Sequence, residues 1–300
     1  MLRTTFLSTV ATMSLLGAAQ ADVPQVATDI APVHGLVARV MQGVGSPDLV
    51  VQPGASPHGY SMRPSEARSL DQADLVFWIG EALTPWLEGS IETLAADAHV
   101  VELLEAEGTN VMEFREGATF AHDDEDHHGE EHHDEAHGEE HHEDHDDHAE
   151  HEEHHDHEGH HHEGADPHAW LAPENGKLWL DLIAAELAEL DPENADLYRA
   201  NAAAGQEEIA ASMVKVDNAL ATFRSSNFMV FHDAYQYFES SFGISASGAI
   251  SLSDATAPSP ARIAEVQETV AKLNVTCVFS EPQFNPGLVA TVLGRNAKTA

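Results

Sequence analysis

The stretch that decides the fold is residues 191–224, which read DPENADLYRANAAAGQEEIAASMVKVDNALATFR. Asp191 is typical of a helix N-cap, and Pro192 is typical of the first helical position. From Pro192 the helical pattern continues to about Phe223, with only Gly205 against it. A helix of this length is about twice the average or more. We therefore expect residues 191–224 to form a rigid helix that links two lobes.

Before this helix, short apolar runs alternate with helical patterns, which is typical of βαβ units and a mostly parallel sheet. The predicted strands are residues 25–27, 49–52, 75–79 and 100–104. The predicted helices are residues 32–41, 64–70, 87–95 and 174–190. We assign residues 22–190 to an N-terminal α/β lobe.

The same alternation resumes after the linking helix. The predicted strands are residues 228–231, 244–249 and 275–280, and the predicted helices are residues 235–242, 260–273 and 286–293. We assign residues 225–300 to a C-terminal α/β lobe, and we expect this lobe to be truncated, because no closing element follows the last helical stretch. The predicted fold is thus α/β, with two mostly parallel sheets flanked by helices and a binding cleft between the lobes.

The chain begins with the pattern of a secretory signal peptide. A basic start at Arg3 is followed by an apolar stretch over residues 6–18 and by Ala19-Gln20-Ala21, an A-x-A cleavage site. The apolar stretch is too short to span a bilayer comfortably. We therefore expect residues 1–21 to be removed and the mature protein to be exported, starting at Asp22.

Residues 121–163, called here the His-rich segment, contain 17 His, 20 Asp or Glu and no Lys or Arg. Neutral imidazole is a good ligand for zinc, copper and nickel, and carboxylates attract cations. Because its charges repel and it lacks large apolar residues, we expect a disordered loop that orders on metal. The alternative is a charged, solvated linker, but a linker needs no imidazole.

The formal net charge of −39 argues against nucleic acid and anionic membranes as partners and suits a protein that meets cations. The single cysteine, Cys277, lies in an apolar run, and we expect it to be buried as a small hydrophobic residue. In an exported protein, an unpaired cysteine also calls for a partner.

Five histidines lie outside the His-rich segment, and three of them follow predicted strands or rejoin the fold in a loop. His58 lies in a Gly- and Pro-containing loop after a strand, His168 follows the His-rich segment, and His232 ends a strand. Ligands of open α/β sheets bind at such positions. His34, in the first turns of a helix, and His99, just before a strand, are expected to be structural or surface residues.

Three neutral imidazoles and one open position would give zinc a tetrahedral shell, with bonds of about 2.0–2.1 Å. We therefore predict a metal site made of His58, His168 and His232, with Zn²⁺ as its ligand. Each histidine taken alone could instead be an ordinary hydrogen-bonded loop residue. The all-imidazole shell disfavours a manganese receptor.

Two other functions use the same residues. A three-His shell with an open position also occurs in zinc enzymes, but the chain has no H-E-x-x-H motif and no Ser or Cys nucleophile motif. We therefore expect that the protein is not an enzyme. A zinc buffer or storage protein, in which the His-rich segment is the whole function, is the main alternative.

Four motifs carry a resemblance to a known family: GASPHGYSMRPS at residues 54–65, DPHAWL at 166–171, FHDAYQYF at 231–238 and FSEPQF at 279–284. In combination they resemble the periplasmic zinc-binding proteins of ABC-type zinc uptake systems, the ZnuA type. The resemblance implies two α/β lobes joined by a long helix and a zinc ion held in the cleft by the three histidines. It also implies delivery of zinc to an ABC permease in the inner membrane, and we expect a monomer.

Two departures from the family pattern leave the fourth metal ligand open. Pro57 stands where some relatives have Glu before the first ligand, and other relatives take a carboxylate from a segment after the fourth motif. Water, a histidine of the His-rich segment or a missing acid could fill this position. The resemblance also implies that Cys277 pairs with a second cysteine near the C-terminus, and that Glu281 supports the site without binding the metal.

Overall fold

The computed structural model describes residues 23–115, 120, 164–251, 258–275, 277–284, 286–293 and 298–299. The expected signal peptide, residues 1–21, and the His-rich segment, residues 121–163, lie outside the described residues. None of the helices in the described ranges is long and apolar enough to cross a membrane.

The N-terminal sheet has four parallel strands in the order β2-β1-β3-β4. The strands are β1 (Val26–Thr28), β2 (Asp48–Leu49), β3 (Leu75–Trp78) and β4 (His99–Glu102). The helices of this lobe are α1 (Ala31–Val40), α2 (Pro64–Asp71), α3 (Pro85–Leu94), the 3₁₀ turn η1 (Ala169–Leu171) and α4 (Pro173–Leu190). Proline stands at or next to the first position of all four α-helices, where its missing N–H costs nothing.

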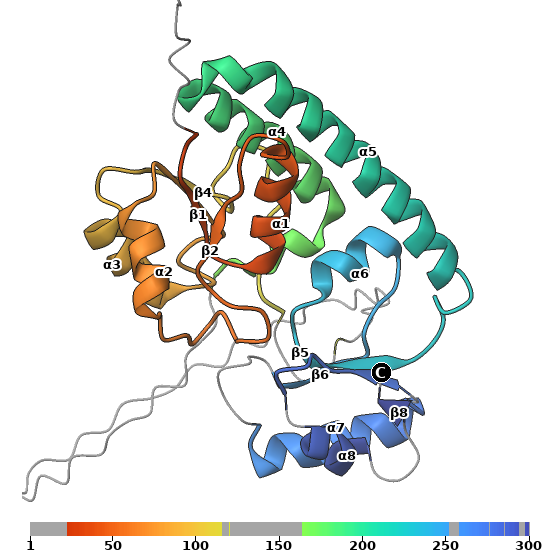
Figure 1. The fold of residues 1–300 in the computed structure, drawn as a ribbon. Helices are drawn as coiled ribbons and strands as arrows, with labels where there is room; N and C mark the ends of the chain where they lie inside the picture. The colour runs from red at the N-terminus through yellow and green to blue at the C-terminus, as the bar shows by residue number, and fades with distance from the viewer. Residues whose placement is uncertain are drawn as a thin grey trace, which may run out of the picture.

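Alternate residues of β3 face the two layers of helices. Leu75 and Phe77 lie in the core formed with α1 and α4, whereas Val76 and Trp78 lie in the core formed with α2 and α3. This period of two is the alternation expected of a strand with both faces buried. Figure 1 shows α2 and α3 on one side of the sheet and α1 and α4 on the other.

The C-terminal sheet is also parallel, with the order β6-β5-β7-β8. Its strands are β5 (Phe228–His232), β6 (Ala249–Ser251), β7 (Cys277–Phe279) and β8 (Lys298–Thr299), and its helices are α6 (Gln236–Phe242), α7 (Pro260–Leu273) and α8 (Pro286–Leu293). Figure 1 shows α6 on one side of this sheet, and α7 and α8 on the other.

One long helix, α5 (Ala195–Leu220), runs from the N-terminal lobe to the C-terminal lobe (Figure 1). It packs against α4 and α1 at one end and contacts α6 at the other. The predicted fold class, two lobes of mostly parallel sheet flanked by helices and joined by a long helix, is confirmed.

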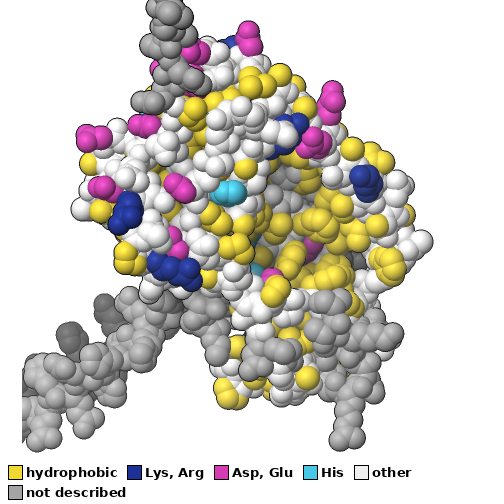
Figure 2. Space-filling model, viewed as in Figure 1, with side chains coloured by type: hydrophobic (Ala, Val, Ile, Leu, Met, Phe, Trp, Pro, Cys, Tyr) yellow, Lys and Arg dark blue, Asp and Glu magenta, His cyan; other side chains and the backbone are white. Residues whose placement is uncertain are grey.

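A groove of about 420 Å³ lies under α5 and is lined by residues of α1, α4, α5 and α6. Figure 2 shows hydrophobic side chains gathered in this hollow between the two lobes. The groove is mainly apolar, and none of the described residues that line it is a histidine.

The linking helix begins later than predicted. Residues Pro192–Asn194 form a 3₁₀ turn, η2, and the α-helix starts at Ala195. Asp191 does not cap a backbone N–H, because its buried carboxylate accepts hydrogen bonds from Tyr198 Oη (2.8 Å) and from Asn194 Nδ2 (2.7 Å). These two hydrogen bonds hold the turn η2 and the start of α5 against the buried carboxylate of Asp191.

Two strand predictions were wrong in their bounds. β6 is Ala249–Ser251 and not residues 244–249, because Ile244 N donates back to Glu239 O and so closes the end of α6. Ser247 N, just before β6, already donates to Phe228 O of β5. The second strand was expected at residues 49–52, and only Asp48–Leu49 form the ladder, although Val50 N and Val51 N still donate to β1 and the residue after it.

Two expectations for the end of the chain were also wrong. β8 pairs with β7 where no closing element was expected. Cys277 is half-buried and not fully buried, and it is a free thiol among the described residues.

Gly205, the one residue against the helical pattern, lies where α5 crosses α4 and α1. A Cβ atom at this position would lie 2.9 Å from Leu180 Cδ1 and 3.2 Å from Arg39 Cγ. Both distances are shorter than ordinary van der Waals contact. The helices approach so closely because this residue has no side chain.

We predict that Gly205→Val lowers the free energy of unfolding by about 1–3 kcal/mol, since the added side chain overpacks the helix crossing. The matched control is Gly89→Val in α3, where a Cβ would meet nothing within 4 Å. Urea denaturation of both variants measures the difference. Equal stability of the two variants would contradict the close crossing.

Candidate metal centre

The first predicted ligand, His58, lies in the loop between β2 and α2. The indole N–H of Trp86, in the first turn of α3, donates to Pro57 O at 2.7 Å and so fixes the backbone next to His58. Trp86 could not be identified from the sequence, because its partner lies 29 residues away and no local pattern marks the contact.

The second predicted ligand, His168, is 4% exposed and directly precedes η1. Its backbone N–H donates to Asp166 Oδ1 at 2.9 Å, and its Nδ1 lies 2.6 Å from the same oxygen. A carboxylate has no proton to donate, so in this contact Nδ1 of His168 carries the proton. Nε2 is then the atom left for a metal. This is how carboxylates orient metal-binding imidazoles.

The third predicted ligand, His232, is the last residue of β5 and is 6% exposed. Its Nδ1 lies 2.7 Å from Glu281 Oε1, in the loop after β7, although the angles of this contact fall short of a hydrogen bond. Nε2 is therefore again the atom turned away from the acid. Glu281 lies where a supporting group was expected, beside a ligand.

The three imidazoles lie together. The ring centroids of His58 and His168 are 5.5 Å apart, and those of His168 and His232 are 5.3 Å apart. One nitrogen from each ring lies within 4.8 Å of the other two. Tetrahedral zinc with bonds of about 2.0–2.1 Å separates its nitrogens by roughly 3.4 Å, so small side-chain rotations would close the shell around an ion.

The position of the cluster follows from the sheets. β2 leads into the loop of His58 and β5 ends at His232, so the carboxyl ends of both parallel sheets face the cluster. Ligands of α/β sheets bind at this edge. Among the described residues, the cluster is the one group of three or more His, Cys, Asp and Glu with metal-binding geometry.

The two remaining ordered histidines lie outside the cluster. His34 Nε2 is 3.2 Å from Pro47 O. His99 is largely exposed, and its Nε2 is 3.0 Å from Glu186 Oε2. The structure therefore brings together the three histidines chosen from the sequence and places the other two apart, while the role of the three as ligands stays a prediction.

A buried ion-pair group lies next to His232. The Arg115 guanidinium contacts the carboxylates of Asp233 and Glu239, with Nη1 at 2.8 Å from Glu239 Oε2. Burial raises the pKa of Asp233, and the neighbouring Arg115 opposes this shift. Because Asp233 is bonded to the guanidinium, it is not offered to a metal.

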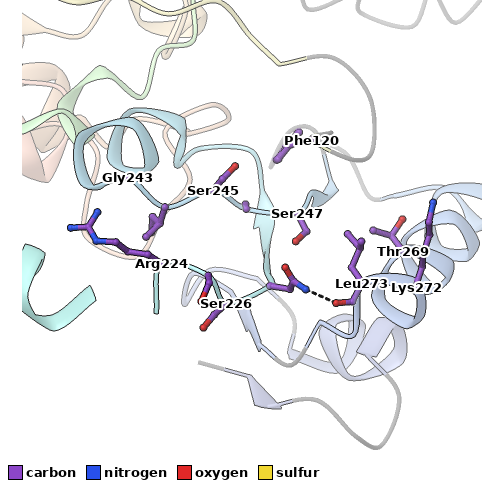
Figure 3. A pocket seen from close by; sticks show the side chains of 13 residues that line it. Phe120, Arg224, Ser226, Gly243, Ser245, Ser247, Thr269, Lys272 and Leu273 are labelled. Atoms are coloured by element: carbon purple, nitrogen blue, oxygen red, sulfur yellow. Dashed lines mark hydrogen bonds between the residues drawn. The ribbon is translucent and has the colours of Figure 1, made fainter. Parts of the chain in front are cut away.

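The C-terminal lobe has a cavity of about 630 Å³ at the opposite, amino-terminal end of its strands (Figure 3). Among the described residues that line it, none is His, Cys, Asp or Glu. Asn227 Nδ2 donates to Leu273 O there at 2.6 Å. Without acidic, imidazole or thiol groups, this cavity offers a metal no ligand of the kinds found in the histidine cluster.

Comparison with known proteins agrees with this geometry. The family model described as "ZnuA: Zinc-uptake complex component A periplasmic" matches residues 26–299. The high-affinity zinc uptake system protein ZnuA of Paracoccus denitrificans (strain Pd 1222) is 42% identical over 275 residues, which are 92% of this chain and 81% of that protein. The protein of the same name from Brucella abortus (strain 2308) is 44% identical over 276 residues, with 91% and 81% covered.

A solved structure has the same fold. A crystal structure of ZnuA superposes with a TM-score of 0.68 and 21% identity, and it covers 92% of this chain and 88% of that one. At this identity the likeness concerns the arrangement of the two lobes and not the ligand.

We predict that Glu281→Ala weakens binding of Zn²⁺ by about 10–100-fold, because the imidazole of His232 loses the carboxylate that lies 2.7 Å from its Nδ1. The matched control is Glu186→Ala, which removes the carboxylate beside His99, outside the cluster. Chelator competition measures both affinities. An unchanged affinity in Glu281→Ala would show that this contact does not support the site.

Proposed function

The chain belongs to the ZnuA family of periplasmic zinc-uptake components, and we propose that it captures Zn²⁺ between its lobes for transport. The ion binds Nε2 of His168 and His232 and one ring nitrogen of His58. The fourth position is left to water or to a further acceptor. Family members are transport proteins and not enzymes.

The observation that carries this proposal is the convergence of three imidazoles from three separate segments. Their ligand atoms lie within 4.8 Å of one another, and His168 and His232 are buried. Carboxylates lie at Nδ1 of both buried rings. Buried imidazoles with a carboxylate beside Nδ1, and with ligand nitrogens close to one another, are typical of a metal site and are not expected of unrelated loop histidines.

The chemistry of the ligands favours zinc over manganese. Imidazole suits zinc, whereas manganese prefers carboxylate, carbonyl and water oxygen. The carboxylates of Asp166 and Glu281 lie at Nδ1 atoms of the rings, and Asp233 is paired with Arg115, so the site does not become oxygen-rich.

The zinc ion is then passed to an ABC permease in the inner membrane, and the protein works in the periplasm as a monomer. The His-rich segment, residues 121–163, assists acquisition, because its 17 His and 20 acidic residues gather cations from dilute solution. The zinc buffer alternative assigns the function to this segment alone and needs no tight site between the lobes.

We predict that the full chain binds one Zn²⁺ tightly and further ions weakly, and that His58→Ala, His168→Ala or His232→Ala each removes the tight ion alone. His99→Ala is the matched control and keeps it, since this residue lies outside the cluster. Zinc titration against a competing chelator measures the number of tightly bound ions, and added manganese tests whether it can displace the zinc. Tight binding that survives all three replacements would assign the function to the His-rich segment.

A further inference from the structure

The two segments that flank the His-rich segment in the sequence pair with each other in a short stem, defined here as residues 112–115 and 164–166. Glu113 and Ala165 form an antiparallel bridge. Phe114 N donates to Gly164 O at 3.2 Å, and Asp166 N donates to Met112 O at 2.8 Å. The stem therefore ends at Asp166, the residue that orients His168.

Helix α6 of the C-terminal lobe binds this stem through two neighbouring side chains. Tyr237 Oη accepts from Met112 N at 2.8 Å and donates to Asp166 O at 2.7 Å. Gln236 Nε2 donates to Glu113 O at 2.7 Å and to Asp166 Oδ2 at 2.5 Å. Tyr237 thus holds only backbone groups, whereas Gln236 also holds the carboxylate.

Both carboxylate oxygens of Asp166 accept hydrogen bonds, which fix the orientation of this side chain. Oδ1 accepts from the backbone and the ring of His168, and Oδ2 accepts from Gln236. Both partners of the Gln236 amide can only accept, so the NH₂ end must point at them. All three residues are buried, where an unmade hydrogen bond is costly.

The stem also contacts the neighbour of the other buried ligand. Arg115 pairs with Asp233, which follows His232, and with Glu239 of α6. Bonds from the C-terminal lobe therefore reach the supports of His168, and bonds from the stem reach the residue beside His232.

We propose that Gln236 is a positioning residue for the metal: from the C-terminal lobe it fixes Asp166, and through Asp166 it aims Nε2 of His168 at the ion. The lobe that supplies His232 thereby also sets the direction of the ligand supplied by the other lobe. This inference rests on the proposed function, because it requires a metal at the three histidines.

The competing explanation is that Gln236 only fastens the stem to α6. Two controls separate the explanations. Tyr237→Phe removes two hydrogen bonds to the stem backbone and leaves the Asp166 carboxylate bonded. Asn201→Leu removes a side-chain amide that also donates two bonds, to Val40 O and Gln42 O at the C-terminal end of α1.

The experiment uses the full chain loaded with Zn²⁺ and an excess of chelator. The weakly held ions leave first, and the remaining slow phase reports the ion at the three histidines. We expect Gln236→Met to accelerate this phase about tenfold, as for loss of a group that supports a metal ligand. Tyr237→Phe and Asn201→Leu should keep the wild-type rate within about twofold, a range that spans ordinary experimental scatter.

A double-variant cycle tests whether Gln236 acts through Asp166. Once Asp166→Asn is present, adding Gln236→Met should change the rate little, because the two residues form one network. Additive effects would overturn the proposed route. If Asp166→Asn does not fold, the visible absorption of Co²⁺ bound to the Gln236→Met single variant decides: a changed spectrum supports the proposal, and the wild-type spectrum overturns it.

The outcomes also distinguish failure of the proposed function from failure of the positioning role of Gln236. A wild-type chain without a slow phase would contradict the proposed function itself. A slow phase that is present in the wild type and unchanged in Gln236→Met would contradict only the positioning role.

Discussion

The buried carboxylate of Asp166 is the group on which the rest of the site depends. It accepts two bonds from His168 and one from Gln236, and its backbone closes the stem below the His-rich segment. Because a buried polar group without its hydrogen bonds is costly, these bonds hold His168, the stem and α6 of the opposite lobe in one arrangement.

The architecture makes such a junction possible. Each sheet is parallel, so its loops after the strands gather at one edge, and His58, after β2, and His232, at the end of β5, both lie in the histidine cluster. The side chain of Tyr237, from the C-terminal lobe, is buried within the core of the N-terminal lobe. The lobes therefore meet through a packed contact beside the histidines as well as through α5, and the histidine cluster is assembled by both.

Much of this could be predicted from the sequence, and the reasons are local. α7 and α8 were predicted with the observed bounds, because proline and an apolar period mark them. β6 was misplaced because Ile244, the first residue of the predicted strand, bonds back to Glu239 of α6. Trp86 and Gln236 were missed because their partners lie 29 to 123 residues away, where no spacing rule applies.

The central claim is that a zinc ion binds where three imidazoles from both lobes converge, two of them with a carboxylate beside Nδ1. The most direct test is anomalous diffraction at the zinc edge from crystals of the zinc-loaded full chain. We expect one peak that lies about 2.0–2.1 Å from a ring nitrogen of each of His58, His168 and His232. A fully loaded crystal whose strong peaks all lie away from these three rings would contradict it.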